Sequence, residues 1–291
     1  MEDKILCIYH KNCTDGTTAA AVLLTKFPDC KLFPLDHNYK EEDIENLLNE
    51  IDKNTTVYIV DFSLREGDTE KILKKAKKVI NIDHHIGVKE RLEELAKKYP
   101  NFEFIFDNHR SGASLTWIYF YGKEKIPEII KLVEDKDIWT WKYGEKTKYV
   151  NSYLTILTDK PEEIKELILR DDISKLIENG KIISQFTDYL INNFIEKVKE
   201  IEIKIGEYTV KGYNTGLFQS EIGNILSTNL KQAVALFSIS GYTVKFSFRS
   251  TEGNKPTALE LAQILGGGGH KHAAGAAVSL NEFCNMIMFN N

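Results

Sequence analysis

The sequence has few cysteines and lacks any long apolar run. Its 291 residues include four cysteines, and their lack of paired spacing favours a reducing compartment over a disulfide framework. They are Cys7, Cys13, Cys30 and Cys284. No apolar stretch approaches the length of a membrane span, and residues 1–4 lead into an apolar run without a signal-peptide pattern. We therefore expect a cytoplasmic protein without a membrane partner.

An excess of positive charge is also lacking. The formal net charge is −5, which argues against a basic face that coats long nucleic acid but permits a small anionic substrate in a local pocket. From Ile201 onward there is no aspartate, and seven Lys or Arg residues stand against six Glu. Any metal site built from aspartates therefore belongs to the part of the chain before Ile201. The later part can supply positive charge and backbone donors.

Short apolar runs alternate with helical patterns in the first third of the chain. We predict strands at 4–9, 31–35, 56–60, 78–83 and 102–106, and helices at 17–26, 41–50, 66–77 and 90–98. This alternation implies right-handed crossovers and a parallel sheet. With 42% hydrophobic and 28% charged residues, the composition is that of an ordinary globular protein.

Polar side chains follow three of the predicted strands. His10 ends the first strand, Asp61 follows the third, and Asp83-His84-His85 ends the fourth. Ligands bind at the carboxyl edge of open parallel sheets. Imidazole and carboxylate together suit Mn²⁺, Zn²⁺ or Fe²⁺ better than Ca²⁺ or Mg²⁺ alone.

Two further aspartates complete a pattern suited to two metal ions. Asp15 lies in the loop after the first strand, and Asp135 follows a predicted helix at 126–134. A two-metal phosphoryl-transfer site needs a bridging carboxylate and ligands from several segments, because the ions lie about 3.5–4 Å apart. Taken alone, Asp15 is more typical of a turn or helix cap and His10 of a strand end, and Asp61 and Asp135 could each be a cap. His37, His109 and His272 lack such a pattern, and we expect them at the surface.

The second half of the chain changes character at Ile201. Residues 161–200 have a helical pattern throughout, which we interpret as ending in a connector. After it we predict strands at 201–205, 208–213, 233–240, 242–249 and 276–280, with helices at 220–227 and 257–265. We place the domains at 1–185 and 205–291, with a helical connector at 186–204, so the later domain is a smaller α+β unit.

Four consecutive glycines, 266–269, precede His270 in this α+β region. A glycine run is often a flexible linker, but between a helix and a strand it permits close approach of backbone N–H groups to a phosphate. Arg249, at the end of a predicted strand, suits a bidentate phosphate contact or an exposed hairpin position. We therefore predict phosphate binding by this region.

These motifs resemble those of the DHH phosphoesterase superfamily, in the group with a C-terminal DHHA1 domain that includes RecJ-like exonucleases and nano-RNases. The resemblance covers essentially the whole chain and implies a parallel-sheet DHH domain, a helical connector and a DHHA1 domain. Ser111-Gly112-Ala113 and the segment 135–139 further resemble a nano-RNase branch. The motifs are Tyr9-His10 with Asp15-Gly16, Val60-Asp61-Phe62-Ser63, Asp83-His84-His85, Asp135, and 266–270 with Ala273-Ala274-Gly275.

The resemblance implies a site for two Mn²⁺ ions, with Mg²⁺ or another divalent ion left open. One ion would be held by His10 and Asp61, and the other by Asp15, Asp61, His84 and Asp135. Asp83 would orient an imidazole and His85 would contact the substrate phosphate. Arg249, Gly268, Gly269 and His270 would bind substrate from the facing domain.

The roles of three residues in this site are left undecided. Most of the superfamily has a second aspartate in the first motif, where this chain has Cys13; a thiolate could favour a softer metal, or water could fill the position. Asp137 is a second candidate beside Asp135, and Arg110 is a further candidate for the site.

The resemblance implies a phosphodiesterase that hydrolyses short oligonucleotides to mononucleotides, through a hydroxide activated by two metal ions in the cleft between the domains. Alternatives are hydrolysis of cyclic dinucleotides, 3′-phosphoadenosine 5′-phosphate or polyphosphate, and a non-catalytic scaffold that carries no stoichiometric metal. The partner would be a short nucleic acid or nucleotide, and a homodimer is left open.

Overall fold

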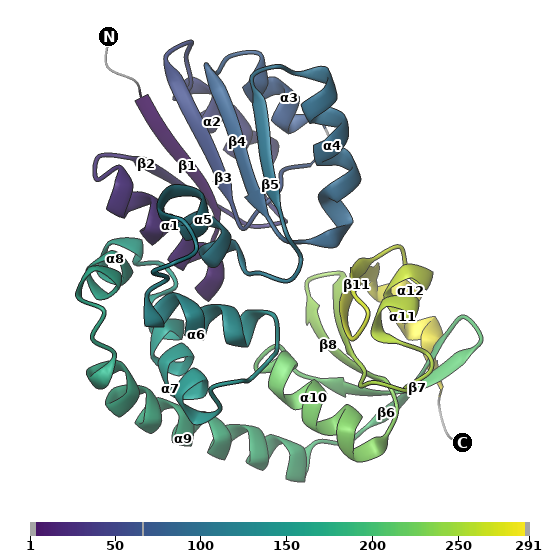
Figure 1. The fold of residues 1–291 in the computed structure, drawn as a ribbon. Helices are drawn as coiled ribbons and strands as arrows, with labels where there is room; N and C mark the ends of the chain where they lie inside the picture. Colours follow the sequence, from purple (N-terminus) through teal and green to yellow (C-terminus); the bar gives the residue numbers. More distant parts are fainter. Residues whose placement is uncertain (1–3, 66, 289–291) are drawn as a thin grey trace. The chain divides into compact units, whose positions relative to one another are not determined.

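The computed structural model describes residues 4–65 and 67–288. By internal contacts the chain divides into two compact units, Met1–Gln185 and Phe186–Asn291. Each carries its own sheet (Figure 1), and the predicted fold class is confirmed.

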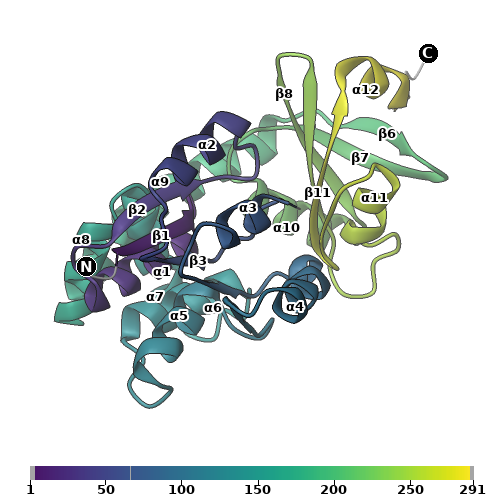
Figure 2. The same ribbon diagram turned by 90° about the horizontal axis from the view of Figure 1, so that it is seen from above.

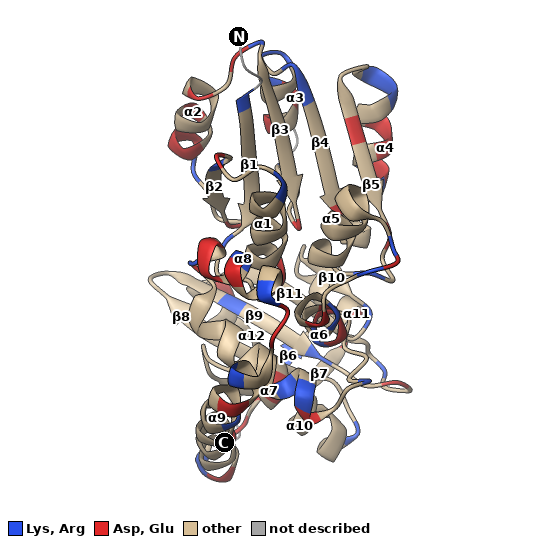
Figure 3. Cartoon of the chain, turned by 60° about the vertical axis from the view of Figure 1, so that its left-hand side comes forward, with Lys and Arg blue, Asp and Glu red and all other residues tan. Residues whose placement is uncertain are grey.

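The first unit is built on a five-stranded sheet in the order β2-β1-β3-β4-β5. All its paired strands are parallel, as the alternation of strands and helices predicts. Its strands are β1 (Lys4–His10), β2 (Lys31–Leu35), β3 (Thr55–Val60), β4 (Lys78–Asp83) and β5 (Phe102–Phe106). Figure 3 shows these strands largely uncharged, with charged residues gathered on helices such as α2 (Glu41–Asn49) and α4 (Lys89–Lys98).

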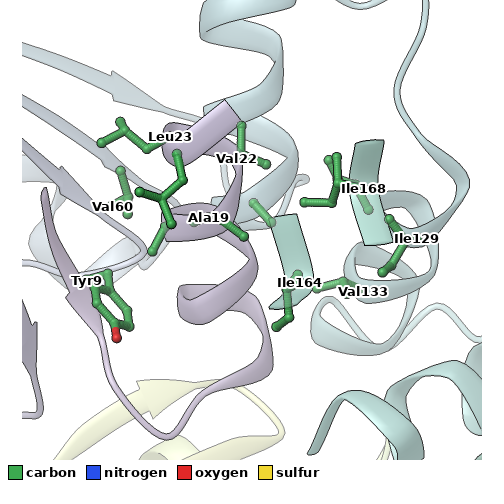
Figure 4. Close-up of a cluster of buried hydrophobic side chains, with 14 of the residues drawn as sticks. Tyr9, Ala19, Val22, Leu23, Val60, Ile129, Val133, Ile164 and Ile168 are labelled. Atoms are coloured by element: carbon green, nitrogen blue, oxygen red, sulfur yellow. The ribbon is translucent and has the colours of Figure 1, made fainter. Parts of the chain in front are cut away.

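Helices cover both faces of this sheet because successive strand residues point to opposite sides. Tyr9 and Val60 pack into a core with the Ala-rich helix α1 (Figure 4), whereas their neighbours Ile8 and Ile59 pack with α2 and α4. The first face carries α1 (Thr14–Lys26), α5 (Gly112–Tyr121), α6 (Glu128–Asp137), α7 (Glu145–Leu154) and α8 (Pro161–Arg170). The second face carries α2, α3 (Asp68–Leu73) and α4.

The strand order changes direction between β1 and β3. The chain leaves β1 through α1 toward β2 and returns through α2 to β3. The crevice beyond the carboxyl ends at such a switch point is the usual ligand-binding position in open α/β sheets. His10 ends β1 and Asp61 follows β3, so both lie at this position.

Two predicted helices differ from those observed. The helix predicted at 66–77 is the shorter α3, and its predicted first residue, Glu66, lies outside the described part of the chain. The long helical stretch is divided into α8 and α9 (Ser174–Lys197), because Asp171 takes a left-handed conformation with φ 46°. Two short 3-10 helices, Ile86–Val88 and Thr155–Leu157, lie in loops.

The second unit contains a seven-stranded sheet in the order β10-β11-β9-β8-β7-β6-β12. Alternate residues of β8 pack on opposite faces: Val234 with helix α10, and Ala235 with helices α11 and α12. Figure 2 shows the strands of this sheet, with α11 and α12 near β11. Its strands are β6 (Ile201–Ile205), β7 (Tyr208–Asn214), β8 (Val234–Ser240), β9 (Thr243–Arg249), β10 (Gly268–His270), β11 (Ala273–Ser279) and β12 (Ile287–Met288). Its helices after α9 are α10 (Gln219–Leu230), α11 (Ala258–Ile264) and α12 (Leu280–Met286).

Three features of this unit differ from the prediction. Part of the predicted glycine loop is strand β10. The strand predicted at 276–280 begins earlier, as β11, and is followed by α12 and β12, which the pattern does not predict. All four cysteines are free thiols, and among the described helices none is long and apolar enough to span a membrane.

Candidate metal centre

Asp61 lies in a strained turn that the neighbouring strand holds in place. Its φ is 51°, a conformation that a non-glycine residue adopts at a free-energy cost and that clusters at functional sites. The Asp61 N–H donates to the Ile82 carbonyl at 2.9 Å. Asn81 Nδ2 donates to the carbonyls of Ile59 and Phe62 on either side of the turn, at 3.1 and 2.9 Å. The motif Asn81-Ile82 therefore fixes the direction of the Asp61 carboxylate.

Two glycines allow helices α1 and α5 to approach Asp61 closely. A Cβ atom on Gly112 would lie 2.5 Å from the Asp61 Cβ, and one on Gly16 would lie 2.3 Å from the His10 carbonyl oxygen. Larger residues would therefore push both helices away from the turn. The approach lets the Asp15 carboxylate accept hydrogen bonds from the N–H groups of Gly112 and Ala113, at 2.6 and 3.0 Å.

Three carboxylates converge on one nitrogen of His84. The His84 Nε2 atom lies 3.1 Å from Asp61 Oδ1, 3.5 Å from Asp137 Oδ2 and 3.9 Å from Asp15 Oδ2. Burial, then the charges of Asp15 and Asp137, raise the pKa of Asp61 well above its usual value. Burial and Asp15 raise the pKa of Asp137 to about 7. A bound cation would relieve this like-charge repulsion.

The structure brings Asp137, and not Asp135, to this group. Both aspartates lie in the last turn of α6, and residues two apart on a helix point about 200° apart. The Asp137 carboxylate joins Asp15 and His84 in one set of potential ligand atoms within 4.8 Å of one another. We therefore transfer the ligand role predicted for Asp135 to Asp137.

Asp135 instead stabilises the turn that follows α6. Its carboxylate accepts hydrogen bonds from the N–H groups of Lys142 and Tyr143, at 2.7 and 3.1 Å, and from the hydroxyls of Thr140 and Thr147. Although burial opposes the charge, these bonds lower the pKa of Asp135. The turn contains two tryptophans with positive φ, Trp139 (60°) and Trp141 (51°). The sequence pattern gives no signal of this hub.

A second set of potential ligands contains His10, Cys13 and Asp61. The Asp61 Oδ2 atom lies 3.8 Å from His10 Nδ1 and 3.6 Å from Cys13 Sγ. The His10 ring stacks on Phe62, with centroids 5.7 Å apart, and burial lowers its pKa to about 4, so that the imidazole is neutral as a metal ligand must be. The structure thus places Cys13 within this set.

Asp83 is buried and orients His85. Asp83 Oδ1 accepts from His85 Nδ1 at 2.7 Å and from the N–H groups of His84 and His85, while Oδ2 accepts from Ser63 Oγ at 2.6 Å. Burial alone would raise the pKa of Asp83, but the bonds from His85 and Ser63 outweigh it and lower the pKa to about 2. His85 also forms a set of potential ligands with Asp61 and His84.

The donor atoms of these sets fit divalent metal ions. Carboxylate oxygens, imidazole nitrogens and one sulfur lie within ligand-to-ligand distances around the single carboxylate of Asp61. Manganese, iron and zinc are bound by such mixed sets. The arrangement has the shared carboxylate that a two-metal site requires.

Comparisons with known proteins agree with this organisation. Residues 203–288 match the family model of the DHHA1 domain. Over 302 residues the chain is 28% identical to the uncharacterized protein R106 of Acanthamoeba polyphaga mimivirus, in a match that covers 95% of this chain and 68% of that protein. Its fold is similar to that of RecJ from Thermus thermophilus in complex with Mn²⁺, with a TM-score of 0.56 and 14% identity, over 97% of this chain and 51% of that one. Residues 203–288 thus form a DHHA1 domain, and the chain as a whole has the DHH-type fold of RecJ.

The same DHH fold is found in an exonuclease RecJ solved with bound manganese. That structure has a TM-score of 0.51 and 14% identity, over 97% of this chain and 88% of that one. At this identity the likeness establishes the fold, so the residue roles depend on the geometry of this chain.

In the DHHA1 domain the glycines have two different uses. A Cβ atom on Gly269 would lie 2.6 Å from the Ala274 Cα, and one on Gly267 would lie 2.1 Å from the Gly275 carbonyl oxygen. These two glycines therefore let β10 pack closely on β11. At Gly268 no described atom lies within 4 Å of the position a Cβ would occupy. Gly268, Gly269 and His270 are exposed on β10, at the edge of the sheet.

Arg249 of the DHHA1 domain is half-buried and anchored. Its Nη1 donates to Ser247 Oγ and to the Phe248 carbonyl, and its Nη2 donates to Ser220 Oγ, each at 2.8 Å. The predicted exposed alternative is therefore not what the structure shows. Arg110, in the DHH unit, pairs with Glu134 at 3.1 Å, and Glu134 also accepts from the Ser111 N–H at the start of α5. Arg110 thus supports the helix whose N–H groups bind Asp15.

His37 lies beside the DHH centre although no motif marks it. Its side chain is exposed, as predicted, but its ring centroid is 4.9 Å from that of His10 and 5.3 Å from that of Phe62. Arg65 Nη2 donates to the carbonyls of His37 and Tyr39 and fixes this loop after β2. None of the three ligand sets found among the described residues contains His109 or His272.

Proposed function

We propose that this protein is a divalent-metal-dependent phosphodiesterase that hydrolyses short oligonucleotides to mononucleotides. The observation that carries the proposal is the position of Asp61, whose two oxygens face different ligand sets. Oδ2 lies 3.8 Å from His10 Nδ1, and Oδ1 lies 3.1 Å from His84 Nε2. A carboxylate in this position can bridge two ions.

The proposed ligands follow from the distances. His10 and Asp61 would hold one ion; Asp15, Asp61, His84 and Asp137 would hold the other. When bound, a pair of divalent ions supplies a nucleophile at neutral pH and neutralises charge on the phosphoryl group. We assign the His85 Nε2 atom, the ring nitrogen that does not bond Asp83, to a phosphate oxygen, where it stabilises developing negative charge. Asp83 is the positioning residue that keeps this ring in place.

The DHHA1 domain would bind the phosphate of the substrate. Arg249 is anchored by three hydrogen bonds and presents a guanidinium suited to phosphate. The exposed edge strand that contains Gly268, Gly269 and His270 supplies backbone donors. The net charge of −5 favours a short substrate, because long nucleic acid is held by extended basic surfaces. A protein of similar fold, RecJ, is named an exonuclease, which supports a nucleic-acid substrate of some kind.

The test is hydrolysis of defined oligonucleotides. Purified protein is incubated with Mn²⁺, Mg²⁺, Zn²⁺ or Co²⁺ and with di- to pentanucleotides, and mononucleotide release is measured. Cyclic dinucleotides, 3′-phosphoadenosine 5′-phosphate and polyphosphate form the comparison panel. Release of mononucleotides from the short oligomers is expected, and it should be lost in His85→Ala but kept in His109→Ala. Stoichiometric metal without hydrolysis of any oligomer would overturn the proposal.

A further inference from the structure

We infer that His10, Cys13 and Asp61 form a thiolate-containing site that selects a softer divalent ion, zinc or ferrous iron. The neighbouring set would hold a harder ion such as manganese or magnesium. The inference rests on the proposed function only in taking this centre to be a metal site. According to this inference, the two metal positions prefer ions of different chemistry.

The separations in the first set are those of ligands on one ion. In a tetrahedral zinc site a sulfur at about 2.3 Å and an oxygen at about 2.0 Å lie about 3.5 Å from each other. Cys13 Sγ and Asp61 Oδ2 are 3.6 Å apart, and His10 Nδ1 is 3.8 Å from the same oxygen. A single ion can therefore contact all three residues with small side-chain adjustments.

The backbone position of Cys13 gives an independent reason. Cys13 is the N-cap residue of α1, with extended φ and ψ of −120° and 132°, and within the described structure its side chain makes no capping hydrogen bond. Ser, Thr, Asp and Asn are preferred at this position because they cap the first turn. Here the side chain points to Asp61 instead. A thiol is a weak donor, so this contact alone is a poor substitute for a cap.

The second set contains no sulfur. Asp15 and Asp137 contribute carboxylate oxygens, His84 contributes an imidazole nitrogen, and Asp61 is shared. Oxygen-rich sets suit manganese and magnesium, whereas a thiolate selects zinc and other softer ions. Because a ligating thiol must lose its proton, binding at the first set would release a proton from Cys13.

Cobalt provides a direct readout of sulfur ligation. Metal-free protein is titrated with Co²⁺, and the near-ultraviolet charge-transfer absorption between thiolate and cobalt is recorded. We expect the band to saturate at one equivalent per chain. Cys13→Ser should abolish it while keeping a hydroxyl that can bond Asp61, and Cys284→Ser, which removes an exposed thiol of the other unit, should leave it unchanged. Binding of two cobalt ions without the band, or a band that survives Cys13→Ser, would overturn the inference.

Metal competition gives a second measurement that does not depend on activity. The protein is dialysed against a series of zinc-to-manganese ratios, because zinc binds most sites more tightly than manganese does. The native chain should retain zinc at the first set at ratios where Cys13→Asp has already exchanged it for manganese. Cys13→Ser should weaken zinc binding by at least about 10-fold, the lower end of what loss of a supporting group costs a metal site. If the variants do not fold, equal retention of the two metals by the native chain still contradicts the inference.

The outcomes distinguish this inference from the proposed function. A chain that binds two ions and cleaves oligonucleotides without a cobalt band contradicts the inference alone. A chain that binds no divalent ion contradicts the proposed function as well.

Discussion

The first unit holds three candidate carboxylates on buried side chains, whereas the second presents exposed backbone on strand β10. Asp15, Asp61 and Asp83 are each at most 2% exposed, and each is fixed by backbone N–H groups or neighbouring side chains. In the second unit Gly268, Gly269 and His270 are exposed on an edge strand. Burying a charge costs free energy unless the charge is paired, hydrogen-bonded or bound to a metal ion. The first unit should therefore determine whether the reaction occurs, and the second how tightly substrate binds.

The sharpest way to break the first unit is Asp61→Asn. This change removes a charge from the carboxylate that lies in one ligand set with His10 and Cys13 and in another with His84 and His85. The value of kcat/KM should therefore fall by more than the roughly 10–100-fold typical of residues that only support a metal ligand. Elemental analysis should show loss of bound metal alongside the loss of turnover. His109→Ala is the control, since none of the three ligand sets among the described residues contains His109. Full metal content in the Asn variant would rule out a bridging role for Asp61.

The two aspartates at the end of α6 should separate metal binding from folding. Asp137→Asn should weaken metal binding and activity by at least about 10-fold, since Asp137 lies in a ligand set, and should leave the thermal stability of the metal-free chain equal or higher because repulsion from Asp15 is relieved. Asp135→Asn weakens charge-assisted bonds to its turn and should cost about 1.5–3 kcal/mol of unfolding free energy. Thermal unfolding and metal titration of both variants measure the difference. If Asp135→Asn lost metal binding and Asp137→Asn kept it, Asp135 would be the ligand as first predicted.

The metal-free protein should lose stability as pH rises above about 6.5. Asp137, whose pKa is raised to about 7, and Asp61, whose pKa is also raised, bind more protons when folded than when unfolded. The free energy of unfolding therefore falls as pH rises past their unfolded pKa of about 3.9. His10, with its pKa lowered to about 4, acts in the opposite direction up to about pH 6.5.

Above about pH 6.5, Asp61 and Asp137 still lower the free energy of unfolding as pH rises, whereas His10 no longer opposes them. Thermal unfolding of metal-free protein at about pH 6.5 and about pH 8 tests the sign. Saturating divalent metal should flatten the dependence, because bound ions replace the protons. Asp137→Asn should reduce the slope in the metal-free form. A metal-free chain that is more stable at the higher pH would mean that the carboxylates do not repel one another as the distances indicate.

The sequence predicts the sheet of the first unit well because its central strands β1, β3 and β4 are buried on both faces and leave continuous apolar runs. The polar residues at the strand ends, His10, Asp61 and His84, are visible for the same reason, since each interrupts such a run. The choice between Asp135 and Asp137 depends on where α6 ends, which periodicity defines poorly: the predicted end at 134 leaves both residues outside the helix. The observed helix includes them and points them apart.

Other contributors are set by tertiary contacts that no local pattern encodes. Asn81 reaches the carbonyls around the Asp61 turn, and His37 comes beside His10 because Arg65 bonds the loop after β2. In the second unit, α12 and β12 follow the predicted last strand; β12 is only two residues long and forms by pairing with β6. A pair of residues carries too little pattern to predict.

Two glycine variants test the role of the exposed backbone in the second unit, and we expect them to change activity least. Gly269 has φ 142°, and a Cβ there would lie 2.6 Å from the Ala274 Cα, so Gly269→Ala should displace β10 and cost about 1–3 kcal/mol of stability. Gly268→Ala meets no described atom within 4 Å and should leave thermal unfolding unchanged. If the exposed backbone of β10 binds phosphate, the methyl group that Gly268→Ala adds should still raise KM several-fold with kcat unchanged. The added group would weaken binding that is common to the ground state and the transition state. An unchanged KM in a stable Gly268→Ala variant would leave phosphate binding to Arg249, and the glycines would then serve only the packing of β10 on β11.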